Sequence, residues 1–276
     1  SGCLLHPPLF IELSMTQTTQ AVVTSQNGGV LTVSLNRPEQ HNAMNPAIMN
    51  ELTRIFGELP ARKDVRVVVL TGNGRSFCAG ADLAFMRAAA DYTFEQNVAD
   101  GQAIFDLMMA VDGCPQPVVG RINGAAIGGG AGLVSCCDIA VASERATFAF
   151  SEARLGIAPA VISPFVLSRI GPGHARELFL TGERFDARRA QAIGLVHHVV
   201  AESELDAVVA DRVAQLLQAA PGAQAAIKEL IRAVACRPKA DMREYTAETI
   251  AHRRAGDEGR EGMSAFLEKR KPWWQE

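Results

Sequence analysis

Residues 117–133 read PVVGRINGAAIGGGAGL, and residues 65–83 read VRVVVLTGNGRSFCAGADL. Each stretch begins with a short, nearly continuous apolar run, which is typical of a buried strand. Each run then passes through a glycine-rich turn and precedes a predicted helix. Because this order of strand, turn and helix recurs, the sequence predicts an α/β fold built from stacked units of that kind.

The flanking segments extend this pattern in both directions. Residues 21–25 and 30–35 are rich in β-formers, and the Asn-Gly-Gly between them indicates a hairpin. Asn45 followed by Pro46 has the chemistry of a helix start. Further helices are expected at 83–90, 102–111, 186–193, 205–219, 223–235 and 241–253. We therefore expect an α/β core over residues 19–200 and a helical C-terminal part over residues 201–276.

The composition of the 276-residue chain is that of an ordinary globular protein, with 48% hydrophobic and 21% charged residues. The net charge of −3 disfavours a strongly basic nucleic-acid binder, so no nucleic-acid partner is expected. No apolar run reaches the roughly 18 residues of a membrane span, so no membrane is expected either. The six cysteines include no CxxC pair, which predicts buried thiols in a reducing compartment and favours the cytoplasm.

The amino-terminal residues differ from the rest of the chain. Residues 1–14 lack an initial Met and lack the basic region of a signal peptide, and Met15 is the expected natural start. Residues 1–18 are therefore expected to be an added segment or a disordered leader.

The two glycine-rich turns are the first candidate for chemistry. A helix start leaves backbone N–H groups without acceptors, and glycine lets a ligand approach the backbone closely. Two such turns that converge would direct two N–H donors at one oxygen, which is an oxyanion hole. The alternative is that the glycines only permit tight turns and close packing, and their spacing alone leaves both interpretations open.

Other motifs with known chemistry do not fit. Residues 171–176 (GPGHAR) begin like a dinucleotide loop but carry Arg at the third glycine position. The sequence has no GxxxxGK[ST] phosphate loop, no HExxH metal motif and no GxSxG nucleophile motif. His197 and His198 are expected to point to opposite faces of a strand, which is unsuited to a shared metal. We therefore expect neither a metal nor a cofactor.

Glu152 is the candidate acid, because it follows a strand-like run and is surrounded by apolar residues. Such a glutamate is often a paired structural charge, here with Arg154 as the nearest partner. Alternatively, burial raises its pKa and makes it a proton carrier near neutral pH.

These motifs together carry a resemblance. Residues 76–83 (SFCAGADL), 123–130 (NGAAIGGG) and 151–159 (SEARLGIAP) follow the order and spacing of the enoyl-CoA hydratase/isomerase (crotonase) superfamily. The flanking matches are LNRP at 35–38, NAMN at 42–45, LTG at 180–182, AIGLV at 192–196 and EGMSAFLEKRKP at 261–272. The resemblance covers roughly residues 20 to 272.

The resemblance implies a spiral of ββα units and a helical C-terminal part that forms a homotrimer, usually assembled as a dimer of trimers. It implies an acyl-coenzyme A substrate, with the N–H groups of Ala81 and Gly129 as oxyanion hole and Glu152 as catalytic carboxyl. The residues that it assigns to substrate binding are His41, Ala43, Ala79, Asp82, Leu83, Gly132, Phe266 and Lys269. Of these, Phe266 and Lys269 would reach the site from the C-terminal part, also across subunits.

One departure bears on the reaction. Hydratases with two catalytic glutamates carry one of them at the position of Gly132 and the other at the position of Glu152. Family members with a single glutamate, at the position of Glu152, include Δ3,Δ2-enoyl-CoA isomerases. The local sequence around Gly132 and Glu152 is nevertheless most similar to that of bacterial 3-methylglutaconyl-CoA and isohexenylglutaconyl-CoA hydratases. A distal carboxylate on such a substrate would need a cation such as Arg87, or would itself act on the water. We expect a hydratase, with the isomerase as alternative and a non-catalytic or RNA-associated family member as a distant third.

Overall fold

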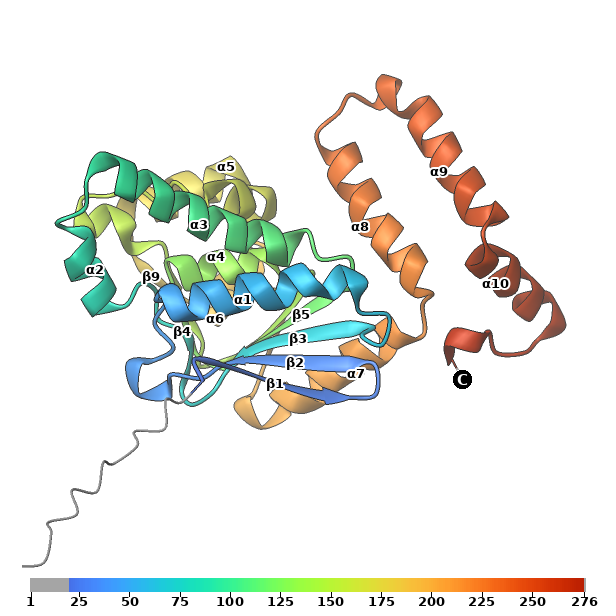
Figure 1. Cartoon of the computed structure of the whole chain (residues 1–276), viewed down its shortest axis with the longest axis horizontal. Coiled ribbons are helices and arrows are strands. Elements are labelled where there is room, and N and C mark those ends of the chain that lie inside the picture. Colours follow the sequence, from blue (N-terminus) through green and yellow to red (C-terminus); the bar gives the residue numbers. More distant parts are fainter. Residues whose placement is uncertain (1–19, 276) are drawn as a thin grey trace, which may run out of the picture.

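The computed structural model describes residues 20–275, so the expected leader over residues 1–18 lies outside the described residues. The fold is α/β, as predicted, with two sheets and helices on their faces (Figure 1).

The larger sheet contains the predicted hairpin. Its strand order is β1-β2-β3-β5-β7-β10; β1 and β2 pair antiparallel and the other neighbours pair parallel. The bounds are β1 Val22–Asn27, β2 Val30–Leu35, β3 Val67–Gly72, β5 Val118–Ile122, β7 Ile139–Ser143 and β10 His198–Val200. The two glycines at residues 28 and 29 form the turn that joins β1 to β2, which confirms the hairpin signal.

The smaller sheet has the order β4-β6-β8-β9, with a parallel β4-β6-β8 part and an antiparallel β9. The bounds are β4 Ser76–Cys78, β6 Ala125–Ile127, β8 Thr147–Ala149 and β9 Arg184–Asp186. β4 and β6 follow closely on β3 and β5 along the chain, so strands of the two sheets alternate in sequence.

The helices are interspersed with these strands up to residue 217, and beyond that residue only helices and short turns follow. They are α1 Pro46–Glu58, α2 Leu83–Ala89, α3 Phe94–Asp112, α4 Gly129–Cys136, α5 Ser163–Thr181, α6 Ala187–Ala192, α7 Leu205–Leu217, α8 Pro221–Ala235, α9 Arg243–Ala255 and α10 Asp257–Glu268. Short 3₁₀ turns are η1 Pro38–Gln40, η2 Leu59–Ala61, η3 Ser151–Leu155, η4 Glu202–Glu204, η5 Lys239–Met242 and η6 Trp273–Gln275. None of the described helices is long and apolar enough to cross a bilayer.

Two local signals in the sequence have the expected structural role. The Asn45 side chain accepts a hydrogen bond from the N–H of Ile48 (3.0 Å) and caps α1, with Pro46 in the first turn. Gly171 adopts φ 69° ahead of Pro172 and kinks α5, so the GPG motif shapes a helix.

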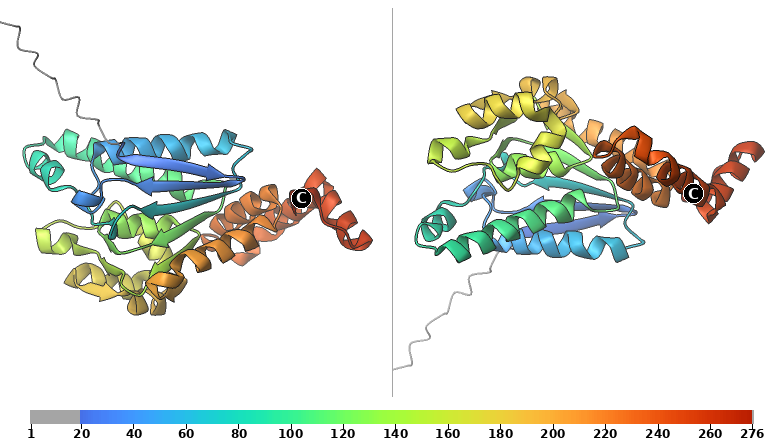
Figure 2. Two further views of the ribbon diagram at one scale, coloured as in Figure 1. Left: turned by 90° about the horizontal axis from the view of Figure 1, so that it is seen from below. Right: turned by 90° about the horizontal axis from the view of Figure 1, so that it is seen from above.

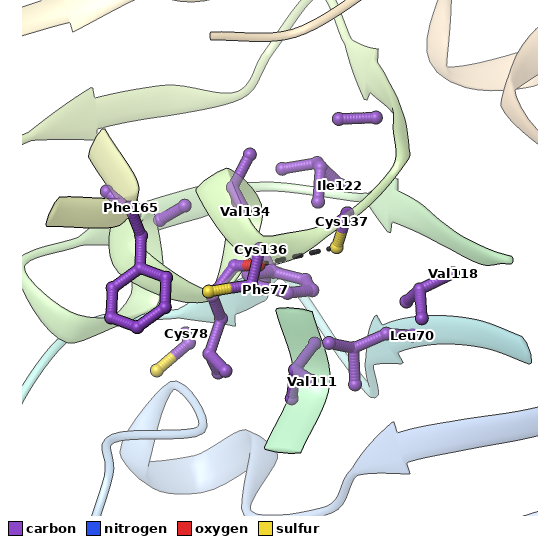
Figure 3. Close-up of a cluster of buried hydrophobic side chains, with 14 of the residues drawn as sticks. Leu70, Phe77, Cys78, Val111, Val118, Ile122, Val134, Cys136, Cys137 and Phe165 are labelled. Atoms are coloured by element: carbon purple, nitrogen blue, oxygen red, sulfur yellow. Dashed lines mark hydrogen bonds between the residues drawn. The ribbon is translucent and has the colours of Figure 1, made fainter. Parts of the chain in front are cut away.

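The main core lies between the sheets and helices α1, α3, α4 and α5. Figure 3 shows part of it, where Phe77, Val134 and Phe165 pack with buried cysteines. Burial raises the pKa of Cys78 to about 11, so this thiol stays neutral and packs as a small apolar group. The described cysteines form no disulfide; Cys78, Cys114, Cys136 and Cys137 are buried and Cys236 is exposed.

A second apolar layer covers the opposite face of the larger sheet. Leu205, Val209 and Val213 of α7 pack on valines of β3, β5 and β7. The residues expected to form one helical C-terminal part are thus divided in space. Helix α7 packs on the larger sheet, whereas α8, α9 and α10 extend away from it (Figures 1 and 2). We call these three helices the C-terminal arm. Lys228 of α8 ties the arm to the core through an ion pair of 2.6 Å with Asp138.

The expected helix at 102–111 begins earlier in the structure, at Phe94. Only its second half carries the buried side chains Leu107, Met108 and Val111 that produced the apolar period. Its start is set by Thr93 and Gln96, which form a reciprocal capping box.

Candidate active site

The two glycine-rich turns meet because their strands are neighbours. β4 and β6 pair in parallel, with Cys78 opposite Ala126, so both turns leave the same edge of the smaller sheet. The first turn leads through Gly80 (φ 94°) to Ala81, and the second leads through Gly128 (φ 52°) to Gly129. Positive φ at both glycines is a conformation that other residues rarely adopt.

Ala81, Gly129 and Glu152 line one cavity of about 260 Å³. Its walls also come from Met44, from helices α1, α2 and α3, and from the segment after η3. The remaining lining residues are Met44, Met49, Phe85, Asn97, Asp100, Gly101, Ile104, Ile157, Ala158, Pro159, Ala160, Val161 and Ile162. The structure therefore brings together the three groups on which the predicted chemistry depends.

Both backbone amides are available to a ligand. Gly80 O accepts from Met44 N (2.7 Å) and Asp82 N donates to Met44 O (2.8 Å), whereas the amide of Ala81 between them has no acceptor among the described residues. Gly129 is the first residue of α4, so its N–H has no acceptor within the helix. Two N–H donors at the wall of one cavity are the requirement for an oxyanion hole.

Glu152 is not the paired structural charge that its sequence context allowed. Arg154 donates to the carbonyl of Thr181 (3.0 Å), and Glu152 has no ion pair in the described chain. Its Oε2 is buried without a hydrogen-bond partner there. Its Oε1 lies 3.2 Å from the position that a Cβ on Gly128 would occupy, so the carboxyl group lies beside the second glycine turn. Burial raises the pKa of this carboxyl, outweighing a bond from its own backbone N–H.

Gly132 lies one turn further along α4 and does not line the cavity. A Cβ on Gly132 would be 2.5 Å from Cγ2 of Ile162 and 3.2 Å from Cε of Met108. The place of a second glutamate is thus filled by apolar packing, and Ile162 presents its side chain to the cavity instead.

The residues expected at the coenzyme A channel lie on two paired segments beside the cavity. Ala79 N donates to His41 O (3.0 Å), and the pairing continues to Met44 and Ala81, which line the cavity. His41 Nδ1 is 3.0 Å from Ser76 Oγ, and the carbonyl of Ala43 accepts from Arg37.

Asp82 has a structural task on this surface. It caps α2 and pairs with Arg37 at 2.8 Å, which holds the pKa of its carboxyl below the ordinary value. Leu83 beside it is 71% exposed.

Phe266 and Lys269 are not brought to the cavity within one chain. Both lie at the end of the C-terminal arm. Phe266 is within α10 and 83% exposed, and Lys269 is the C-cap residue of α10. Figures 1 and 2 show α10 projecting away from α2 and α4.

Helix α3 contributes Asn97, Asp100 and Ile104 to the cavity. Of these three residues, sequence reasoning missed Asp100, which lies before the apolar period that marked this helix. The capping box at Thr93 and Gln96 was the signal that could have placed the helix start correctly.

Comparison with known proteins identifies the family. The family model for enoyl-CoA hydratase/isomerase matches residues 25–276. The chain belongs to this family. A crystal structure of an enoyl-CoA hydratase from Shewanella pealeana has a TM-score of 0.90 and 38% identity to it, covering 94% of this chain and 97% of that one. AtuE of Pseudomonas aeruginosa has a TM-score of 0.90 and 37% identity, covering 93% and 100%.

Among curated relatives of this enoyl-CoA hydratase/isomerase chain, a short-chain-enoyl-CoA hydratase of Clostridium acetobutylicum is 32% identical over 253 residues. That match covers 91% of this chain and 95% of the relative. Membership of the family thus rests on matches that cover nearly all of residues 20–275.

Proposed function

We propose that the protein is a hydratase-type hydro-lyase, which adds water across the double bond of a 2-enoyl-CoA thioester. The observation that carries this proposal is the shared cavity of the Ala81 and Gly129 amides and the Glu152 carboxyl. Relatives along the whole chain are named enoyl-CoA hydratases, which supports the reaction class.

The amides of Ala81 and Gly129 hold the thioester oxygen. As the oxygen of water bonds to C3, negative charge moves onto that thioester oxygen, where two N–H groups stabilise it. One such donor is typically worth ~2.7–4 kcal/mol of barrier.

Glu152 handles the proton. Its carboxylate takes one proton from the attacking water and returns it to C2, while the other hydrogen of the water stays in the product hydroxyl. Positioned acid–base help of this kind typically contributes ~10²–10⁴-fold to the rate. The buried Oε2 without a partner and the raised pKa suit a group that must both accept and donate near neutral pH.

Isomerisation of a 3-enoyl-CoA is the second candidate, and the packing at Gly132 favours it. Moving a proton from C2 to C4 requires one carboxyl group, and α4 supplies no second one because Ile162 fills that place. Two substrates distinguish the reactions. Hydration of crotonyl-CoA removes the absorbance of the conjugated thioester, whereas isomerisation of a 3-enoyl-CoA creates that absorbance. A non-catalytic member gives neither signal and is indifferent to Glu152→Gln.

The acyl group is proposed to be short. The cavity of about 260 Å³ is below the roughly 300–1,000 Å³ of ordinary small-molecule sites. The resemblance suggested a 3-methylglutaconyl-like chain, with its distal carboxylate near Arg87. Arg87 does not line the cavity, and neither does any other Arg, Lys or His among the described residues. Because the lining offers no cation for a distal carboxylate, activity on a glutaconyl thioester should be compared directly with activity on crotonyl-CoA.

We also propose that the C-terminal arm mediates a homotrimer, alone or as a dimer of trimers. Ile227, Ile231 and Val234 of α8 are exposed apolar side chains at helical spacing, and Phe266 and Leu267 of α10 are 83% and 79% exposed. An apolar surface of this kind on a projecting arm supports self-association. In such an assembly Phe266 and Lys269 would be free to meet the site of another subunit.

A further inference from the structure

One wall of the cavity carries a charge that the proposed reaction does not use. Asn97 and Asp100 lie three residues apart on α3, hence on one face of this helix, and both line the cavity. Glu152, on η3, supplies a second carboxyl group to the same space.

Asp100 differs from other half-buried aspartates of the molecule because nothing compensates its charge. Asp82 pairs with Arg37 at 2.8 Å and Asp138 pairs with Lys228 at 2.6 Å. In the described part of the chain Asp100 has no ion-pair or hydrogen-bond partner, and the cavity has no cationic lining residue. Burial alone raises the pKa of its carboxyl, which is the sign of a charge removed from water without a counter-charge.

We propose that Asp100 is a specificity residue that directs the enzyme to neutral acyl chains and excludes chains with a distal carboxylate. This inference rests on the proposed function, since it requires the acyl chain to occupy this cavity. A carboxylate at the end of the chain would join two carboxyl groups in a confined, partly desolvated space. Like charges there repel more strongly than in water, because the effective dielectric is lower. A neutral chain of the same shape meets no such penalty.

The test compares two thioesters that differ only in charge. Glutaconyl-CoA carries a terminal carboxylate, and its carboxamide analogue has the same shape without the charge. The quantity measured is the ratio of kcat/KM for the amide to that for the acid, at low ionic strength, for the wild type, Asp100→Asn and Asp106→Asn. Asp106 is the matched control because it is exposed on the same helix and does not line the cavity.

The wild type should prefer the amide by about tenfold or more. Asp100→Asn should reduce that preference about tenfold, mainly by lowering KM for the acid, and Asp106→Asn should leave it unchanged. Because the readout is a ratio within each protein, a general loss of activity cancels.

Two results would overturn the inference. One is a wild type that prefers the acid. The other is an Asp100→Asn variant with an unaltered ratio, including one in which both rates fall equally, which would give Asp100 a role in the chemistry or the fold. A wild type that hydrates none of the thioesters, crotonyl-CoA included, contradicts the proposed function instead.

Discussion

Gly132 offers the sharpest test of the packing behind the site. Alanine at this position places a Cβ 2.5 Å from Cγ2 of Ile162, closer than real contacts allow, and 3.1 Å from Cβ of Ile162, which is a tight contact. Since Gly132 lies within α4 and Ile162 is 3% exposed, neither can move freely. Overpacking of this kind costs about 1–3 kcal/mol, and replacing glycine in a helix returns roughly 0.5–1 kcal/mol. We expect Gly132→Ala to lower the free energy of unfolding by up to about 2.5 kcal/mol.

The assay is urea unfolding at one fixed protein concentration, because self-association would couple stability to concentration. Gly57→Ala in α1 is the matched control, since a Cβ there has nothing within 4 Å, and it should raise stability by roughly 0.5–1 kcal/mol. Ile162→Ala alone should cost about 2–5 kcal/mol, and adding Gly132→Ala to it should cost nothing further. If Gly132→Ala raises stability as much as Gly57→Ala does, or has the same effect with and without the Ile162 side chain, the explanation for the glycine is wrong.

Three further predictions concern the carboxyl group and the arm. Glu152→Gln should lower kcat for crotonyl-CoA by ~10²–10⁴-fold. The variant should still bind a thioester that forms an enolate, and the absorbance of the enolate measures this binding. Unchanged turnover would remove Glu152 from the mechanism. The pKa of Glu152 is raised in the folded state, so this state binds the proton more tightly than the unfolded state does, and stability should fall as pH rises from the ordinary carboxyl range through the raised pKa. Unfolding measured across that window should show this decline in the wild type and lack that contribution in Glu152→Gln. Ile231→Glu should yield a smaller species by light scattering, because it places a charge on the exposed apolar face of α8; an unchanged mass would exclude this face as the interface.

Sequence reasoning identified the elements whose signals are local. The hairpin, the cap at Asn45 and the strand–glycine–helix units depend on a few neighbouring residues, and the structure has all of them. Ala81 and Gly129 were assigned through the resemblance to the family, because the spacing of the glycines alone left open whether these turns bind a ligand.

Features that depend on distant partners were not accessible in this way. Glu152 could be a paired or a free carboxyl until Arg154 was found to donate to Thr181. Asp100 gave no signal, because its half of α3 faces a cavity and therefore lacks an apolar period. The division of the helical C-terminal part between sheet and arm was invisible for a similar reason, since α7 and α8 are both amphipathic.

By itself, then, the amino-acid sequence determined the kinds of element, the positions of the two glycine-rich turns and the resemblance to a family. Only the tertiary structure decided that the turns meet, that Ile162 occupies the space beside Gly132 and that two uncompensated carboxyl groups share one cavity. The physical reason is range. Turns and caps are set by backbone conformation over a few residues, whereas burial, charge compensation and steric fit are properties of side chains that come together from distant parts of the chain.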